Sequence, residues 1–273
     1  MRTLYVSDLD GTLLNKSDRI NGRGLGIING LVGEGMLFTY ATARSLASAR
    51  VVTQGLSVRN PVIVYNGVFI MEPDTGRVVS SEGFSGEERA FVREKLTESG
   101  ISPFVYSMIG GEEKVSYDGS CLNEGKERYL SLRKGDRRFR RLDGDAGLYD
   151  GEMFYFTCIG EKEEFEGAYR LFETDGRFTC TFQQELYRPE WWFEIMPRKA
   201  SKYNGILKLK DILGCDRIVS FGDAVNDIPM FRISDECYAV GNAVPELKAV
   251  ATGIIGDNES DSVALWLRNH AER

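Results

Sequence analysis

The feature that most constrains this chain is an apolar segment near its start that runs into two aspartates. Residues 4–6 are apolar, Asp8 and Asp10 follow two positions apart, and Gly11 comes next. An apolar run that ends in polar residues and a glycine is typical of a buried strand followed by a tight turn. Open α/β sheets place ligand sites at the carboxyl ends of such strands, and side chains at i and i+2 of an extended segment share a face. We therefore expect the carboxylates of Asp8 and Asp10 to face one point.

Two carboxylates held this close raise each other's pKa unless a cation or a strong donor lies near them. A hard divalent cation such as Mg²⁺, which prefers oxygen ligands, or a shared proton would stabilise the pair. A calcium-binding EF-hand loop begins in a similar way, but it needs further oxygen ligands, whereas Thr12-Leu13-Leu14 follow here. For the pair taken alone, a strand end and a turn remain the plainer interpretation.

Strands and helices alternate along most of the chain, with short loops between them. We expect strands at residues 4–6, 36–41, 62–65, 191–196, 217–221 and 237–240, and helices at 19–34, 46–54, 202–213, 226–232 and 261–269. This alternation predicts an α/β fold with a doubly wound, Rossmann-like parallel sheet. Residues 69–71 and 77–79 instead predict a β-hairpin.

The pattern changes between residues 83 and 188, where charged helical segments alternate with strands of a separate α+β type. This insert is long enough to be a domain. We therefore predict a core domain from residues 1–82 and 189–273, interrupted by an inserted domain at 83–188. A basic stretch at 133–141 is more typical of a solvated face than of a binding site for an acidic group.

Composition narrows the compartment and the partners. A net charge of −7 disfavours nucleic acid, whose binding is dominated by phosphate neutralisation. No apolar run approaches the roughly 20 residues that span a bilayer, so no membrane partner is expected. The five cysteines are scattered without a Cys-x-x-Cys pair, and no signal-peptide pattern precedes the first strand. These features predict a cytoplasmic protein without a disulfide framework.

A second acidic cluster, Asp223 and Asp227 with Asn226 between them, follows another apolar strand. If the two strands are central in one sheet, Asp8, Asp10 and Asp223 meet at the same edge and form an oxygen-rich site suited to Mg²⁺. A turn residue and a helix N-cap would account for single members of the cluster but poorly for the group.

Two further positions begin helices after predicted strands. Thr42 has a hydroxyl and adjoining free N–H groups, which together make an anion site, although an ordinary N-cap is the simpler interpretation. Lys202 begins a helix, where a cation is locally unfavourable, so we expect another interaction to hold it there.

The order Asp-x-Asp, Thr, Lys, Asp resembles the four motifs of the haloacid dehalogenase superfamily of phosphohydrolases. The segments that carry the closer resemblance, to its Cof-type branch, are Asp8–Leu14, Ala41–Arg44, Asn66-Gly67, Gly222–Met230 and Gly241–Ala243. That branch includes sugar phosphatases. The chain departs from it at Ala43 and Ala224, where the branch usually has glycine, and Lys199 is the second candidate for the third-motif lysine.

The resemblance implies a haloacid dehalogenase core with an inserted α/β cap that closes over the site. It implies that Asp8 attacks phosphorus to form an aspartyl-phosphate and that Asp10 is the general acid and base. The implied Mg²⁺ ligands are the Asp8 carboxylate, the Asp10 backbone carbonyl and Asp223, with support from Asp227. The implied phosphate-binding groups are those of Thr42, Ala43, Lys202 and Asn226.

We therefore predict a Mg²⁺-dependent phosphatase of a small phosphate ester, with a sugar phosphate as the leading candidate. A phosphomutase on the same scaffold and a non-catalytic phosphate-ester sensor are the alternatives. A signalling receiver also uses acidic residues, Thr and Lys, but its Lys comes last, whereas Asp223 follows Lys202 here.

Overall fold

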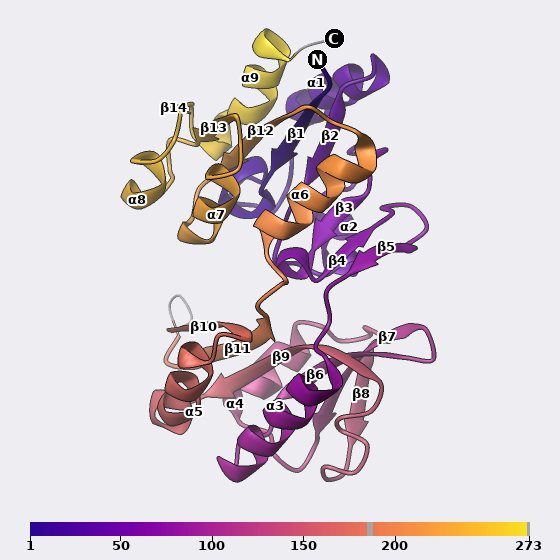
Figure 1. The fold of residues 1–273 in the computed structure, drawn as a ribbon, viewed down its shortest axis with the longest axis vertical. Coiled ribbons are helices and arrows are strands. Elements are labelled where there is room, and N and C mark those ends of the chain that lie inside the picture. The colour runs from indigo at the N-terminus through magenta and orange to yellow at the C-terminus, as the bar shows by residue number, and fades with distance from the viewer. Residues whose placement is uncertain (185–187, 272–273) are drawn as a thin grey trace. The chain divides into compact units, whose positions relative to one another are not determined.

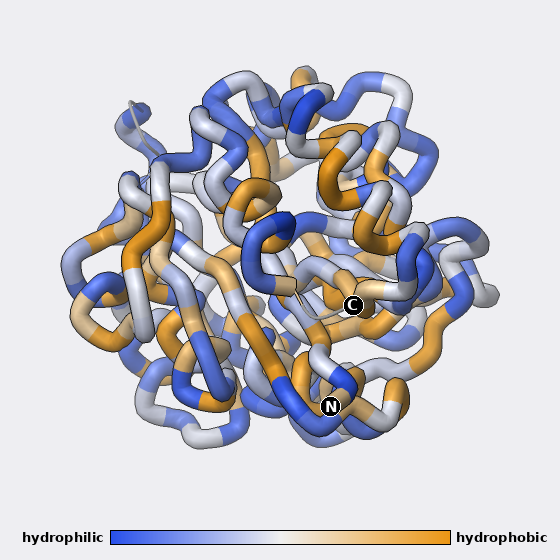
Figure 2. Tube along the Cα trace, turned by 90° about the horizontal axis from the view of Figure 1, so that it is seen from above, coloured by the Kyte–Doolittle hydropathy of each residue, from blue (hydrophilic) through white to orange (hydrophobic). Residues whose placement is uncertain are grey.

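The computed structural model describes residues 1–184 and 188–271 and confirms the expected α/β fold class. The chain forms two compact units, one from Met1–Ser81 with Ala200–Arg273 and the other from Glu82–Lys199 (Figure 1). Hydrophobic and hydrophilic stretches alternate along the chain (Figure 2). No helix in the described ranges combines the length and the apolarity needed to cross a membrane.

The first unit is built on a parallel sheet of five strands in the order β14-β13-β12-β1-β2. These strands are β1 (Thr3–Ser7), β2 (Leu37–Tyr40), β12 (Arg217–Gly222), β13 (Glu236–Ala239) and β14 (Gly253–Ile254). Every residue of β1 is buried, as expected of the central strand of a sheet that is covered on both faces. The strand lies between β12 and β2, although β12 is more than two hundred residues away in the sequence.

Helices lie between these strands and after the last of them. They are α1 (Gly22–Gly33), α2 (Leu46–Val52), α6 (Lys202–Leu213), α7 (Ile228–Phe231), α8 (Pro245–Lys248) and α9 (Ser262–His270). Helix α1 packs against α9, and α6 packs against α7. Helix α6 is capped by Gly214, whose left-handed backbone (φ of 62°) would be strained with an L side chain.

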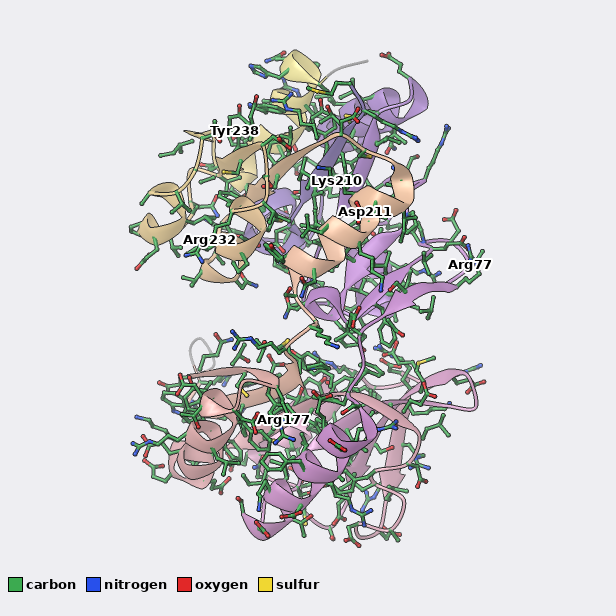
Figure 3. All side chains as sticks on the ribbon, in the orientation of Figure 1. Arg77, Arg177, Lys210, Asp211, Arg232 and Tyr238 are labelled. Atoms are coloured by element: carbon green, nitrogen blue, oxygen red, sulfur yellow. The ribbon has the colours of Figure 1, made fainter. Side chains whose placement is uncertain are left out.

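The strand expected at 62–65 does not continue the parallel sheet as predicted. Strand β3 (Val62–Val64) pairs antiparallel with β4 (Phe69–Met71), which pairs antiparallel with β5 (Val78–Ser81). Its link to the main sheet is an isolated parallel bridge between Ala41 and Ile63. The prediction was wrong because the turn at 65–67, with positive φ angles, closes a local hairpin. The predicted β4–β5 hairpin is confirmed, and its Arg77, labelled in Figure 3, pairs with Glu72.

The second unit contains a six-stranded sheet in the order β10-β11-β9-β6-β7-β8, in which only β7 and β8 pair in parallel. Its strands are β6 (Phe104–Ile109), β7 (Glu112–Asp118), β8 (Phe139–Leu142), β9 (Glu152–Gly160), β10 (Phe178–Gln184) and β11 (Trp191–Pro197), and its helices are α3 (Gly86–Glu98), α4 (Glu124–Ser131) and α5 (Lys162–Thr174). Side chains of α3, α5 and the sheet form its core, including Leu96, Phe156 and Phe172. Arg177, labelled in Figure 3, covers the ring of Phe91 at 4.3 Å from its centroid.

The strand predicted at 191–196 belongs to this second sheet and not to the parallel core sheet. Strand β11 pairs antiparallel with both β9 and β10, and Phe193 and Ile195 join the core of the second unit. The prediction was wrong because an apolar run does not show which sheet it completes. The second unit accordingly extends to Lys199, eleven residues beyond the predicted boundary at 188. In the basic stretch, Arg138 pairs with Glu113 and with Asp136, so its charge is already compensated within the second unit.

Candidate active site

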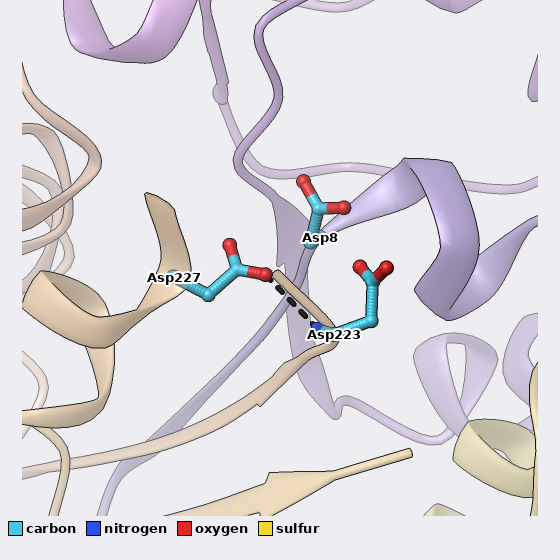
Figure 4. Close-up of side chains that lie close together, drawn as sticks. All are labelled: Asp8, Asp223 and Asp227. Atoms are coloured by element: carbon cyan, nitrogen blue, oxygen red, sulfur yellow. Dashed lines mark hydrogen bonds between the residues drawn. The ribbon is translucent and has the colours of Figure 1, made fainter. Parts of the chain in front are cut away.

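Three carboxylates meet at the carboxyl edge of the parallel sheet in the first unit. Asp8 follows β1, Asp223 follows β12, and Asp227 lies one short turn further on. Because Ser7 is paired with Phe221 in the register of β1 and β12, the segments that follow the two strands leave the sheet side by side. Each residue offers an oxygen, and these oxygens all lie within 4.8 Å of one another (Figure 4). The structure thus brings Asp8 and Asp223 together as the sequence predicted.

Lys202 is the cation of this cluster. Its buried Nζ donates to Asp8 Oδ1 at 2.5 Å and to Asp227 Oδ1 at 2.8 Å. Burial lowers the pKa of Lys202, but the charges of the two carboxylates raise it by more, so the lysine remains protonated. These contacts explain why a lysine occupies the first position of α6. The alternative candidate, Lys199, is exposed and belongs to the second unit.

Both oxygens of the Asp227 side chain are already hydrogen-bonded. Oδ1 accepts from Lys202, and Oδ2 accepts from the backbone N–H groups of Asp223 at 3.0 Å and Ala224 at 3.1 Å. The side chain is completely buried. Asp227 therefore fixes the position of Lys202 and of the Asp223 backbone. Ala224 has an extended backbone with φ of −117°, so the alanine at this position introduces no strain.

The charges of the cluster do not balance. Three carboxylates face one ammonium group, which leaves two negative charges if all three are ionised. Burial, together with repulsion from Asp227 and Asp223, raises the pKa of Asp8 to about 8 against the lowering effect of Lys202. Burial is also the main cause that raises the pKa of Asp223 to about 6.

The residues present fit a divalent cation. In the described structure, Oδ2 of Asp8 and Oδ2 of Asp223 accept no hydrogen bond from protein groups, so both are available as ligands. Mg²⁺ prefers oxygen ligands such as carboxylates, and its two positive charges would balance the two excess negative charges of the cluster. The donor set contains no sulfur or imidazole that would favour a softer metal.

Asp10 does not join this group of carboxylates. It lies in the turn Leu9–Leu13, and its half-exposed side chain makes a bidentate ion pair with Arg44. The nearest oxygen and nitrogen atoms of the pair are 2.5 Å apart. The expectation that Asp8 and Asp10 face one point was wrong because the strand does not continue past Asp8: the chain enters the turn Leu9–Leu13, and from this turn Asp10 reaches Arg44. Arg44 begins the loop before α2, and Asp10 raises its pKa.

Three other predicted residues lie on loops around the sheet edge. Thr42 is completely buried, and its hydroxyl accepts from the N–H of Arg44 at 3.1 Å. Ala43 and Asn226 are exposed. Ala43 does not have a positive φ, so the methyl group that replaces the usual hydrogen is accommodated without backbone strain.

Comparison with known proteins assigns this site to a family. The family model described as haloacid dehalogenase-like hydrolase matches residues 5–267, which is nearly the whole chain. The chain belongs to the haloacid dehalogenase-like hydrolases. The predicted recognition, including the Cof-type branch, is therefore confirmed.

The hydrolase is similar to two phosphatases of Bacillus subtilis strain 168 over nearly its full length. The 5-amino-6-(5-phospho-D-ribitylamino)uracil phosphatase YitU is 25% identical over 276 residues, covering 98% of this chain and 97% of that protein. The phosphatase YwtE, named for the same substrate, is 27% identical over 287 residues, covering 95% of each chain. A crystal structure of a Thermotoga maritima protein shares the fold, with a TM-score of 0.79, 21% identity and coverage of 100% and 99%. With the family match, these relatives make the hydrolase a haloacid dehalogenase-type phosphatase.

Sequence reasoning missed one functional contact of the hydrolase. Thr12 Oγ1 donates to Asp223 Oδ1 at 2.8 Å and so orients the second carboxylate of the cluster. Gly11 packs against the same carboxylate so closely that a Cβ there would overlap it. The signal was present in the order Asp-Gly-Thr, since a small residue and a hydroxyl donor follow the motif directly. The contact could not be inferred from this order alone, because the sequence does not show that Asp223 lies beside the turn.

Proposed function

We propose that the enzyme is a Mg²⁺-dependent phosphatase that hydrolyses a small phosphorylated metabolite through an aspartyl-phosphate on Asp8. The observation that carries the proposal is the buried Asp8 carboxylate, which Lys202 holds through one oxygen while the other accepts no hydrogen bond from the described part of the chain. A carboxylate placed in this way is a nucleophile with a fixed direction of attack. Its two acidic neighbours and its one cation match the requirement of phosphoryl transfer for positioning and charge neutralisation.

In the proposed reaction, Asp8 attacks phosphorus and the bond from phosphorus to the ester oxygen breaks. Asp10 gives a proton to the departing alkoxide, so the alcohol leaves neutral. Asp10 then removes a proton from water, which attacks the phosphorus of the aspartyl-phosphate. This step releases inorganic phosphate and restores the Asp8 carboxylate. In the structure both oxygens of Asp10 are bound by Arg44, so the proposed reaction requires the protonated Asp10 side chain to leave Arg44 before it donates to the ester oxygen.

Lys202, the Thr42 hydroxyl, the Ala43 N–H and Asn226 are the proposed binding groups for the phosphoryl oxygens. The proposed Mg²⁺ ligands are the carboxylates of Asp8 and Asp223 and the backbone carbonyl of Asp10, supported by Asp227. When bound, the ion would offset the repulsion between the phosphate and the anionic cluster. Without it, three carboxylates and one ammonium group would repel a phosphate dianion.

The proposed substrate class is a phosphorylated sugar or sugar alcohol. The Bacillus relatives are named as phosphatases of a phosphoribitylamino uracil, which is a sugar-alcohol phosphate. We propose that residues 82–199 serve as the cap domain, because this insert separates the motif at Thr42 from that at Lys202. A cytoplasmic location is also proposed, since all five cysteines are free thiols.

The test is a phosphate-release screen over phosphorylated sugars, sugar alcohols and nucleotides, with Mg²⁺ and with a chelator. Asp8→Asn should abolish turnover, whereas Asp211→Asn, an exposed aspartate on α6, should not change it. Full activity of Asp8→Asn would exclude the covalent mechanism. Transfer of phosphate to a second hydroxyl without release of inorganic phosphate would identify a phosphomutase.

A further inference from the structure

Both ends of the Asn242 side-chain amide are hydrogen-bonded to the backbone, although the residue is exposed. It lies on the loop after β13, and its Nδ2 donates to the carbonyl of Gly11 at 2.7 Å. Its Oδ1 accepts from the backbone N–H of Asn258 at 3.0 Å. A solvated asparagine has no need of protein partners, so an exposed amide with both ends bound to backbone marks a fixed position.

Asn258 continues this connection. Its side chain is buried, and its Nδ2 donates to the carbonyl of Leu14 at 2.8 Å. The two residues, which we call the asparagine clamp, therefore hold both ends of the Gly11–Leu14 turn from loops more than two hundred residues away in the sequence. A backbone bond from the N–H of Leu14 to the carbonyl of Leu9, at 2.8 Å, also spans the turn.

The turn held by the asparagine clamp also orients the carboxylate of Asp223. The Gly11 carbonyl belongs to the peptide unit that leads into Thr12, whose hydroxyl donates to Asp223 Oδ1. The loop that carries Asn242 also holds the other side of this aspartate, because the N–H of Val244 donates to the Asp223 carbonyl at 2.8 Å. Asn242 thus connects the turn with the carboxylate that the turn orients.

We propose that Asn242 is a positioning residue that keeps the turn after the nucleophile in register with Asp223. By holding Gly11, it fixes the two residues on either side of this glycine, which are Thr12, bonded to Asp223, and Asp10. The inference rests on the proposed function, because it assigns Asp223 to cation binding and Asp10 to proton transfer. Groups that orient metal ligands by hydrogen bonds typically change metal affinity 10- to 100-fold when they are lost.

The chain offers a matched control. Asn29 on α1 makes the same two kinds of bond, from Nδ2 to the carbonyl of Gly55 at 2.8 Å and to Oδ1 from the N–H of Ser57 at 2.7 Å. This asparagine links α1 to the segment after α2 and has no bond to the carboxylate cluster in the described structure. Its removal costs the same contacts without touching the turn.

The experiment compares Asn242→Ala with Asn29→Ala in the full chain. Mg²⁺ affinity is measured without substrate, by calorimetry or by thermal shift over a Mg²⁺ series, and kcat and KM are measured on the best substrate of the screen. We expect Asn242→Ala to weaken Mg²⁺ binding about 10-fold and to lower kcat about 10-fold, with KM within twofold. We expect Asn29→Ala to lose about as much thermal stability as Asn242→Ala but to keep the wild-type Mg²⁺ affinity and kcat.

A second variant isolates the donor. Asn242→Asp keeps the acceptor for Asn258 but cannot donate to Gly11, so its kcat should fall as in Asn242→Ala. The proposal is overturned if Asn242→Ala matches Asn29→Ala in Mg²⁺ affinity and in kcat. It is also overturned if Asn242→Asp retains the wild-type kcat. If the wild type itself binds no Mg²⁺, the proposed function fails first, and that result is separate.

Discussion

Replacement of Lys202 by methionine tests the electrostatics of the cluster most severely. Methionine has nearly the same length and keeps the buried stem packed, but it removes the ammonium group that contacts Asp8 and Asp227. The side chain of Lys202 is 3% exposed, and those of its partners are 9% and 0% exposed. Water therefore replaces little of the lost interaction, and two carboxylates are left buried without their cation.

The size of the effect follows from this burial. Removing one partner of a buried ion pair typically costs about 3–5 kcal/mol, because the remaining charge has no compensation. We expect Lys202→Met to lose a free energy of unfolding of about that size at neutral pH in a chelator. Activity should fall by at least about 100-fold, as is common when one donor to a transition-state anion is lost.

Urea unfolding followed by circular dichroism gives the stability, and phosphate release gives the activity. Lys199→Met is the control, because Lys199 is exposed and three residues away in the sequence. The control should keep the stability to within about 0.5 kcal/mol and should keep the activity. Wild-type stability and activity in Lys202→Met would refute the reasoning, and so would a larger loss of both in Lys199→Met.

Two further changes test other parts of the structure. Gly67 has φ of +98°, and a Cβ there would overlap the backbone of Ser201, so Gly67→Ala should destabilise the chain by about 3 kcal/mol and lower activity. Gly100→Ala, at φ of +67° with open space, is the control in thermal unfolding and should cost only about 1 kcal/mol. In the second unit, bonds from the Ser120 side chain and backbone are the main cause that lowers the pKa of Asp118 to about 2. The ionised Asp118 therefore adds to the free energy of unfolding above its ordinary pKa of 3.8, and this contribution is lost as the pH falls toward 2. At neutral pH we expect Asp118→Asn to lower the free energy of unfolding by at most about 2 kcal/mol. In unfolding measurements at a series of acid pH values, the difference from the wild type should shrink between pH 3.8 and 2.

The sequence predicted the parts of the fold that are set by local patterns. Apolar runs bounded by turn residues gave β1, β2, β12 and the helix that begins at Lys202. Sheet membership was beyond such reasoning, because β11 is as apolar as a core strand and only its partners decide where it lies. The third strand was misassigned for the same reason.

In the site, residues that share a strand end could be placed from the sequence, but the directions of their side chains could not. Asp8 and Asp223 follow adjacent strands, so their meeting was predictable once both strands were taken as central. The direction of the Asp10 side chain was not predictable, because the strand gives way to the turn Leu9–Leu13 directly after Asp8, and Asp10 pairs with Arg44 there. The bond from Thr12 to Asp223 joins residues 211 positions apart, and no local pattern reports such a contact.

The central claim is that Asp8 carries the phosphoryl group during turnover. The most direct measurement is to quench the enzyme during turnover, reduce it with borohydride and map the product by peptide mass spectrometry. Borohydride reduces acyl phosphates to alcohols, so we expect homoserine at position 8 only when substrate and Mg²⁺ are both present. Unmodified Asp8 in every sample, in an enzyme that releases phosphate at its normal rate, would contradict it.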